Sequence, residues 1–198
     1  MHNKTIKIAL VGQPNVGKSM LINSISNARL RVGNFSGVTV AKEEVFLKYK
    51  DYQIQITDLQ GAYSLNDYTL EENVTKEFLD KEDYDIILNV LDSTNLQRNL
   101  LLTSVLLALD KKMILALNMS DEADKELITI DELQLSKILG KPCIKTSAAK
   151  KSGIDRLLNE IVSKFESEKL PTKLCFSDVI EEEIETISAL LHDCGYKT

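Results

Sequence analysis

The segment from Gly12 to Ser19, with the sequence Gly-Gln-Pro-Asn-Val-Gly-Lys-Ser, matches the pattern of a phosphate-binding loop. It follows an apolar run and opens a helical pattern. In such a loop, consecutive backbone N–H groups surround the β- and γ-phosphates, and Lys18 adds a point charge while the Ser19 hydroxyl ligates magnesium. The residues expected to contact the nucleotide are Gly12, Gln13, Pro14, Asn15, Val16, Gly17, Lys18 and Ser19.

A second motif, Asp58-Leu59-Gln60-Gly61, follows the apolar stretch 54–57. Ligands of open α/β sheets bind at the carboxyl ends of the strands, so Asp58 is placed to hold magnesium directly or through water. Gly61 can donate its backbone N–H to a γ-phosphate because no side chain blocks the approach. Asp-x-x-Gly alone is a weak signal, and its position after Lys18 strengthens it.

A third motif, Asn118-Met119-Ser120-Asp121, ends another apolar run and indicates recognition of guanine. Asp121 would accept hydrogen bonds from the N1–H and the 2-amino group, a donor pair that adenine lacks. Asn118 would contact the base edge and brace the loops, and Met119 would stack on the base. Ser147 and Ala148 would complete the pocket through their backbone N–H groups.

The segment 34–40 lies where a loop can reach the γ-phosphate and its metal. Thr39 is the candidate for the second hydroxyl ligand of magnesium, and Gly37 and Val38 are expected to contact the nucleotide beside it. The alternative is that Thr39 is a β-branched residue that starts a strand. If Thr39 is the ligand, the loop should be ordered with GTP and released after hydrolysis.

Short apolar runs alternate with helix-length segments, which predicts βαβ units and a mostly parallel sheet with helices on both faces. The segment 40–49 alternates in polarity and joins 52–57 through a short turn, which predicts an antiparallel hairpin at a sheet edge. The expected class is therefore an α/β P-loop GTPase fold, mostly parallel with one antiparallel edge strand, plus a C-terminal helical segment. We expect the remaining strands at 7–11, 86–91, 113–117 and 142–145, and helices at 18–26, 70–79, 97–109, 130–139 and 154–166.

Composition restricts the class of partner and the compartment. The 198 residues carry a formal charge of −6 without a lysine- or arginine-rich run, which disfavours a nucleic-acid partner because phosphate neutralisation dominates that affinity. Three cysteines without a CxxC pair are typical of structural thiols in a reducing compartment. No run approaches the roughly 18 apolar residues of a spanning helix, and the N-terminus leaves no room for a secretory leader. We expect a cytoplasmic segment that does not cross a membrane.

The pattern changes near residues 169–171, and a helical run begins at Ser177 or Asp178. One helix cannot form a core of its own. We therefore expect a nucleotide-binding domain over 1–168, whereas residues 169–198 either pack on that domain or begin a second domain that is cut off at Thr198. We favour the second possibility.

Over about residues 3–166, the chain resembles the N-terminal cytosolic G domain of the FeoB family, the prokaryotic ferrous iron transport proteins. Gln60 departs from the proline usual in the family, and Val16 stands where a small polar residue is frequent. The matching motifs are Asn34-x-x-Gly37-Val38-Thr39-Val40, Asp58-Leu59-x-Gly61-x-Tyr63-Ser64-Leu65, Ala116-Leu117-Asn118-Met119-x-Asp121 and, most specific of all, Asp92-x-Thr94-Asn95-Leu96-x-Arg98-Asn99-Leu100 with Leu102-Thr103.

The resemblance implies GTP and GDP as ligands, magnesium held by Ser19, Thr39 and Asp58, and a membrane-embedded transporter region in the same polypeptide. It also implies the cytoplasmic face of the inner membrane and small cytosolic Feo accessory proteins as partners. In the family's terms, residues 169–198 look like the truncated start of a helical spacer domain. Ala62 stands where many GTPases carry the glutamine that orients water, so we expect slow hydrolysis.

In the family, Asn15 is associated with a potassium ion that replaces an arginine finger, so we hypothesise potassium stimulation. Asn15 can also be a simple turn residue after Pro14. The residues expected to act in hydrolysis are Asn15, Lys18, Thr39 and Gly61.

Two other functions fit parts of the sequence. A soluble GTPase of ribosome assembly shares the Gly-x-Pro-Asn-Val-Gly-Lys-Ser loop, but such proteins carry basic RNA-binding appendages, which this acidic chain lacks. A nucleotide-gated binding module without catalysis is also compatible with a complete magnesium site and a weak catalytic apparatus.

Overall fold

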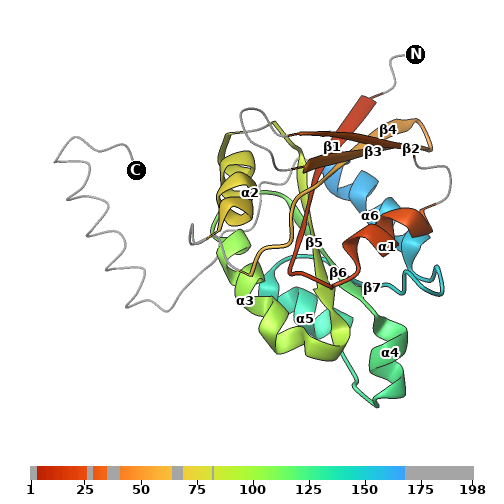
Figure 1. The fold of residues 1–198 in the computed structure, drawn as a ribbon. Helices are drawn as coiled ribbons and strands as arrows, with labels where there is room; N and C mark the ends of the chain where they lie inside the picture. Colours follow the sequence, from red (N-terminus) through yellow and green to blue (C-terminus); the bar gives the residue numbers. More distant parts are fainter. Residues whose placement is uncertain (1–3, 26–28, 35–40, 64–68, 82, 168–198) are drawn as a thin grey trace, which may run out of the picture.

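The computed structural model describes residues 4–25, 29–34, 41–63, 69–81 and 83–167. They form one seven-stranded sheet in the order β2-β3-β4-β1-β5-β6-β7 (Figure 1). The strands are β1 (Lys4–Gly12), β2 (Arg29–Asn34), β3 (Ala41–Tyr49), β4 (Tyr52–Asp58), β5 (Ile86–Asp92), β6 (Met113–Asn118) and β7 (Cys143–Lys145).

The strands from β4 through β1, β5 and β6 to β7 pair in parallel, whereas β3 is antiparallel to both β4 and β2. The predicted mostly parallel α/β fold and the predicted hairpin are confirmed. The outermost strand, β2, was not predicted, so the hairpin strand β3 is second from that edge. The alternation of arginine with Leu30 and Val32 is too short to predict a strand by itself, and the strand's place is set by pairing with β3.

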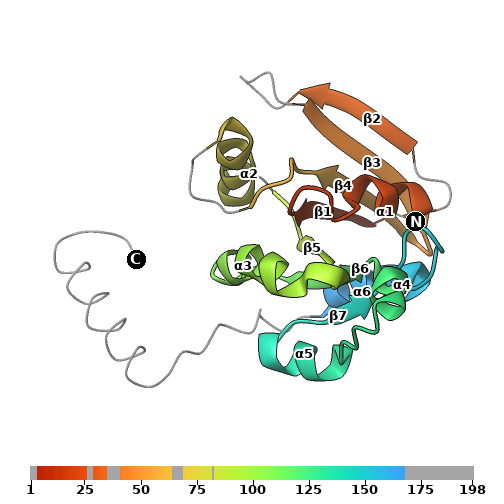
Figure 2. The same cartoon turned by 60° about the horizontal axis from the view of Figure 1, so that its bottom comes forward.

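Alternate residues of β1 face opposite sides of the sheet, and each side is covered by helices. Ile6 and Ile8 belong to one apolar cluster, whereas Ala9 and Val11 belong to the other. Figure 2 shows the two helical layers. The first cluster includes residues of α1 (Lys18–Ser24) and α6 (Ile154–Glu166), and the second is packed by α2 (Leu70–Lys81), α3 (Leu96–Leu107) and α5 (Glu132–Leu139).

Helix α4 (Ser120–Lys125) was not predicted, because it is short and polar and begins directly after the Asn118-Met119 pair. Helix α1 ends at Ser24, earlier than predicted, because Ile25 adopts an extended conformation. No helix within the described ranges is long and apolar enough to span a bilayer. The helical run predicted from residue 177 lies outside the described residues.

The register of the parallel strands brings the polar motifs to one edge of the sheet. Leu10 pairs with Asp58, Gly12 pairs with Val90, and Asp92 pairs with Asn118. The phosphate-binding loop, the Asp-x-x-Gly motif and the base-reading motif therefore begin at neighbouring strand ends. This is the edge at which open α/β sheets bind ligands.

Gly153 lies just before α6 with a φ of +76°, and a Cβ built there would be 2.1 Å from the backbone oxygen of Lys145. Gly153→Ala combines left-handed strain with a backbone clash, so we expect it to lower the free energy of unfolding by about 3 kcal/mol. Gly140→Ala is the control, since Gly140 also has a positive φ, of 63°, and its strain alone should cost about 1 kcal/mol. Urea denaturation measures both variants, and equal losses would contradict the clash.

Candidate functional site

The phosphate-binding loop connects the end of β1 at Gly12 to the start of α1 at Lys18. Asn15 and Gly17 have left-handed φ values of 66° and 85°, which coil the backbone tightly before the helix. A Cβ on Gly12 would lie 2.6 Å from the backbone oxygen of Val90, so only glycine fits where the loop leaves the sheet. Coiled backbone of this kind presents N–H groups to an anion at a helix N-terminus.

Lys18 and Asp58 face each other across the loop, with the lysine Nζ 4.0 Å from Asp58 Oδ1. Each side chain is only 11% exposed. Burial lowers the pKa of Lys18, and the attraction of Asp58 only partly offsets that effect. Burial likewise raises the pKa of Asp58 to about 6, against the attraction of Lys18 and with a contribution from Glu43. For both side chains, the free energy of hydration lost on burial therefore exceeds the gain from their mutual attraction.

A hollow of about 200 Å³ opens beside this pair. Asp58 Oδ1 is buried there and has no hydrogen-bond partner among the described residues. Magnesium prefers oxygen ligands and in phosphate sites is usually held by only one or two protein groups. The Asp58 oxygen without a hydrogen bond and the nearby side chain of Ser19 fit such an ion. The lining residues are Lys18, Ser19, Glu43, Asp58, Leu59, Gln60 and Gly61.

Gly61 lies against the phosphate-binding loop. A Cβ at this position would be 3.0 Å from the backbone nitrogen and Cα of Pro14. The next residue, Ala62, is buried, and its backbone N–H donates to the oxygen of Gly12 at 3.3 Å. The position at which many GTPases place a glutamine thus holds a small side chain that is turned into the protein.

Asn118 connects the phosphate-binding loop to the loop that follows β7. Its Nδ2 donates to the backbone oxygen of Val16 at 2.9 Å, and its Oδ1 accepts from the backbone N–H of Ala148 at 3.1 Å. Only 1% of Asn118 is exposed, so these bonds are shielded from water. The predicted bracing role of Asn118 therefore has a direct geometric basis.

Asp121 lies in the first turn of α4, after Met119 at a φ of 58°. The Ser147 hydroxyl hydrogen-bonds to the Asp121 carboxylate, which lowers the pKa of Asp121, and Lys150 adds to the effect. The carboxylate is thus held ionised, the form that accepts two hydrogen bonds. Lys150, whose Nζ is 3.9 Å from Asp121 Oδ2, was not predicted.

The structure brings together the predicted residues of the phosphate-binding loop, Asp58, Gly61, the base-reading motif and Ser147-Ala148. Gly37, Val38 and Thr39 lie outside the described residues, so their predicted contacts stay predictions. Sequence reasoning missed Glu43 as well as Lys150. Glu43 belongs to β3 and pairs with Asp58 across the hairpin, a relation that register alone reveals.

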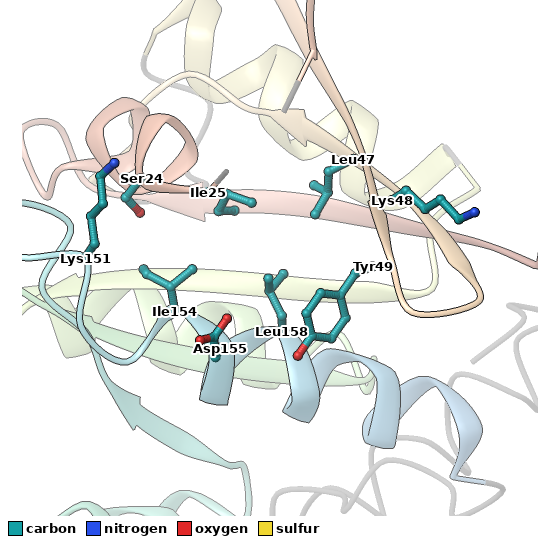
Figure 3. A pocket seen from close by; sticks show the side chains of 9 residues that line it. All are labelled: Ser24, Ile25, Leu47, Lys48, Tyr49, Lys151, Ile154, Asp155 and Leu158. Atoms are coloured by element: carbon teal, nitrogen blue, oxygen red, sulfur yellow. The ribbon is translucent and has the colours of Figure 1, made fainter. Parts of the chain in front are cut away.

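A larger hollow, of about 300 Å³, lies elsewhere, between the end of α1, the end of β3 and the start of α6 (Figure 3). Figure 3 shows Ile25, Leu47, Ile154 and Leu158 facing into it, with Lys48 and Lys151 at its two ends. It contains none of the motif residues.

Comparison with known proteins relates this geometry to a family. The family model described as ferrous iron transport protein B matches residues 6–161. The Fe(2+) transporter FeoB of Helicobacter pylori (strain ATCC 700392 / 26695) is 62% identical over 159 residues, which are 80% of this chain and 24% of that protein. The chain thus spans about a quarter of the length of this relative.

Two solved structures of the cytosolic domain of the T. maritima FeoB iron transporter are similar to the chain. GDP form II has a TM-score of 0.88 at 36% identity, and the alignment covers 96% of this chain and 75% of that one. The GMPPNP form has a TM-score of 0.88 at 37% identity, with 95% of this chain and 75% of that one covered.

The raised pKa of Asp58 predicts a gain in stability when its charge is removed. Because the pKa rises from 3.8 to about 6 on folding, the folded chain holds more protons in that window, and stability falls as pH rises through it. Without nucleotide at pH 7.5, we expect Asp58→Asn to raise the free energy of unfolding by about 1–3 kcal/mol and to flatten this pH dependence. Magnesium-dependent nucleotide binding should weaken at the same time.

Urea denaturation between pH 4 and pH 8 measures the effect of Asp58→Asn. Asp83→Asn is a suitable control, because Asp83 is an exposed carboxylate on the surface and pairs with Lys7. If Asp58→Asn is instead less stable at pH 7.5, the attraction between Lys18 and Asp58 outweighs the cost of burying the Asp58 charge, and the prediction is wrong.

Proposed function

Because this chain belongs to the ferrous iron transport protein B family, we propose that it is the GTP-binding and GTP-hydrolysing domain of a ferrous iron transporter. The domain changes conformation with nucleotide state. It is joined in the same polypeptide to a membrane-embedded region that carries the iron, and it lies at the cytoplasmic face of the inner membrane. Residues 1–168 form the nucleotide-binding domain, and residues 169–198 begin a helical spacer.

The bridge made by Asn118 is the single observation that supports guanine nucleotide binding most directly. The side chain that touches the phosphate-binding loop at Val16 also holds the loop at Ala148, with Asp121 three residues away. A nucleotide with its phosphates over Lys18 would thus have its base beside Asp121. Guanine offers that carboxylate two donors, which adenine does not. The GDP and GMPPNP forms of the T. maritima protein agree with this choice.

In this proposal, Ser19, Asp58 and Thr39 hold magnesium, which neutralises phosphate charge when it is bound. Lys18 contacts the β- and γ-phosphates. Gly61 donates its backbone N–H to the γ-phosphate, and Gly37 and Val38 flank Thr39 around the nucleotide. The buried charges of Lys18 and Asp58 regain favourable partners when nucleotide and metal enter, which favours the bound state.

Hydrolysis is proposed to be slow and to be stimulated by potassium. The side chain of Ala62 cannot orient a water molecule, so catalysis has to come from charge stabilisation at the phosphates. Asn15 is exposed in the phosphate-binding loop, where its side chain can ligate potassium beside the β- and γ-phosphates.

The alternative of a ribosome-assembly GTPase is not favoured, given the family membership and a charge of −6. A binding module that holds GTP without hydrolysing it differs in one measurable property, the release of phosphate in a single turnover. No phosphate release over hours, with magnesium and potassium present, would favour the binding module.

Calorimetry tests base recognition. We expect GDP to bind and ADP to bind at least about a hundredfold more weakly, because adenine leaves Asp121 without its donors. Asp121→Asn should lose GDP affinity and gain affinity for xanthosine diphosphate, whose 2-oxo group accepts from an amide. Asp124→Asn, on the exposed side of the same helix, is the control and should bind GDP normally. Equal affinities for GDP and ADP would refute the proposed function.

Steady-state phosphate release tests the potassium proposal. At equal ionic strength, turnover in potassium should exceed that in sodium by about tenfold, the order of magnitude expected of one added charge at the phosphates. Asn15→Ala should remove the difference while keeping GDP binding. Asn159→Ala, on α6 and away from the loop, should retain it. Equal rates in both salts for the unmodified chain would contradict the role of Asn15.

A further inference from the structure

The segment 92–103, the most family-specific stretch of the sequence, has no part in the nucleotide contacts described above. In the structure it connects the end of β5 to α3 and is held firmly in place. Asp92 Oδ1 accepts from the backbone N–H and the hydroxyl of Thr94, at 2.8 and 2.7 Å. Further along, Asn89 Nδ2 donates to Thr103 Oγ1 at 2.7 Å in the protein interior. The first turns of α3 are thereby fixed to the sheet.

The start of α3 is also bonded to the phosphate-binding loop. The side chain of Gln13, which is only 4% exposed, donates from Nε2 to the backbone oxygen of Arg98 at 2.9 Å. A buried amide bonded to a main-chain oxygen has a defined geometry, because losing the bond would leave polar groups unpaired. Arg98 therefore has a fixed position relative to the loop that binds the phosphates.

The side chain of Arg98 reaches a different segment. Its guanidinium carbon lies 4.8 Å from the ring centroid of Tyr63, within the range of a cation–π contact. Tyr63 is 48% exposed and stands two residues after Gly61. Arg98 thus contacts the phosphate-binding loop through its backbone and the Asp-x-x-Gly segment through its side chain.

The Asp-x-x-Gly segment is attached to the sheet on both sides of Gly61. Before the glycine, the backbone N–H of Leu59 donates to the oxygen of Leu10 at 3.0 Å. After it, the bond from Ala62 to the oxygen of Gly12 is long, at 3.3 Å. The contact of Tyr63 with Arg98 reinforces this weaker attachment, one residue further on.

We propose that Arg98 is a positioning residue for the reaction: by holding Tyr63, it keeps the backbone N–H of Gly61 directed at the γ-phosphate. This inference rests on the proposed binding and hydrolysis of GTP and assigns a task to the 92–103 segment. GDP has no γ-phosphate, so its binding does not use the contact. Breaking the contact selectively affects GTP.

The experiment uses the chain with Arg98→Met, Tyr63→Leu and both substitutions together. Three quantities are measured: GTP turnover, the affinity for GDP, and the affinity for a non-hydrolysable GTP analogue. Each single substitution should lower turnover, and the ratio of analogue affinity to GDP affinity, by about threefold to fivefold, the size expected of one exposed cation–π contact. The double variant should lose no more than either single variant, because both break the same contact.

Conservative and control variants separate positioning from general damage. Arg98→Lys keeps a cation and Tyr63→Phe keeps the ring, so both should retain most of the turnover. Arg156→Met removes an exposed arginine on α6 that pairs with Glu132, and it should behave like the unmodified chain. GDP affinity should be unchanged in all variants, and thermal stability should fall by no more than the loss of one exposed cation–π contact explains.

The outcomes distinguish failure of this proposal from failure of the proposed function. If the unmodified chain binds GTP but does not hydrolyse it, hydrolysis is refuted, whereas the affinity ratio still tests Arg98. If it hydrolyses GTP and Arg98→Met does so equally well with an unchanged affinity ratio, the positioning role is wrong. An equal loss of GDP and analogue affinity, or additive losses in the double variant, would also overturn it.

Discussion

The candidate site depends on one buried amide, that of Asn118. Its two polar atoms join the phosphate-binding loop at Val16 to the loop at Ala148, and almost no water reaches them. Bonds of this kind are costly to break, because each leaves an unpaired group in the interior. The distance between these two loops is thereby fixed by the protein itself. A ligand that spans the two loops meets a site that is already organised.

Whereas both side-chain polar atoms of Asn118 are hydrogen-bonded, the charges of Lys18 and Asp58 are not well compensated. Burial lowers the pKa of Lys18 and raises that of Asp58. The surroundings therefore disfavour the charged form of both side chains. Asp58 also has a carboxylate oxygen without a hydrogen bond. Such a pair lowers the stability of the ligand-free protein. Buried charges with shifted pKa values are common at functional sites. Under the proposed function, a polyanion beside Lys18 and a metal ion beside Asp58 would supply the missing partners.

The role proposed for the segment 92–103 depends on contacts that only the folded structure reveals. Gln13, Arg98 and Tyr63 are widely separated in the sequence and meet because β1 lies between β4 and β5 in the sheet. No local sequence pattern predicts these contacts, since neither an exposed arginine nor an exposed tyrosine has a periodic signature. Glu43 and Lys150 were missed for the same reason: strand register and a loop conformation brought each to a carboxylate.

The sequence by itself determined the fold class, the parallel strands and the residues of the three motifs. Apolar periodicity, glycine placement and the Gly-Lys-Ser run are local and strong. The family resemblance rested on longer motif matches, above all the segment 92–103. Tertiary structure decided what depends on register and burial: the edge strand β2, the short helix α4, the pKa of Asp58 and the contacts of Asn118 and Arg98. The physical reason is that hydration loss and cross-strand distance are properties of residues that are remote in the chain, and the folded sheet alone makes them neighbours.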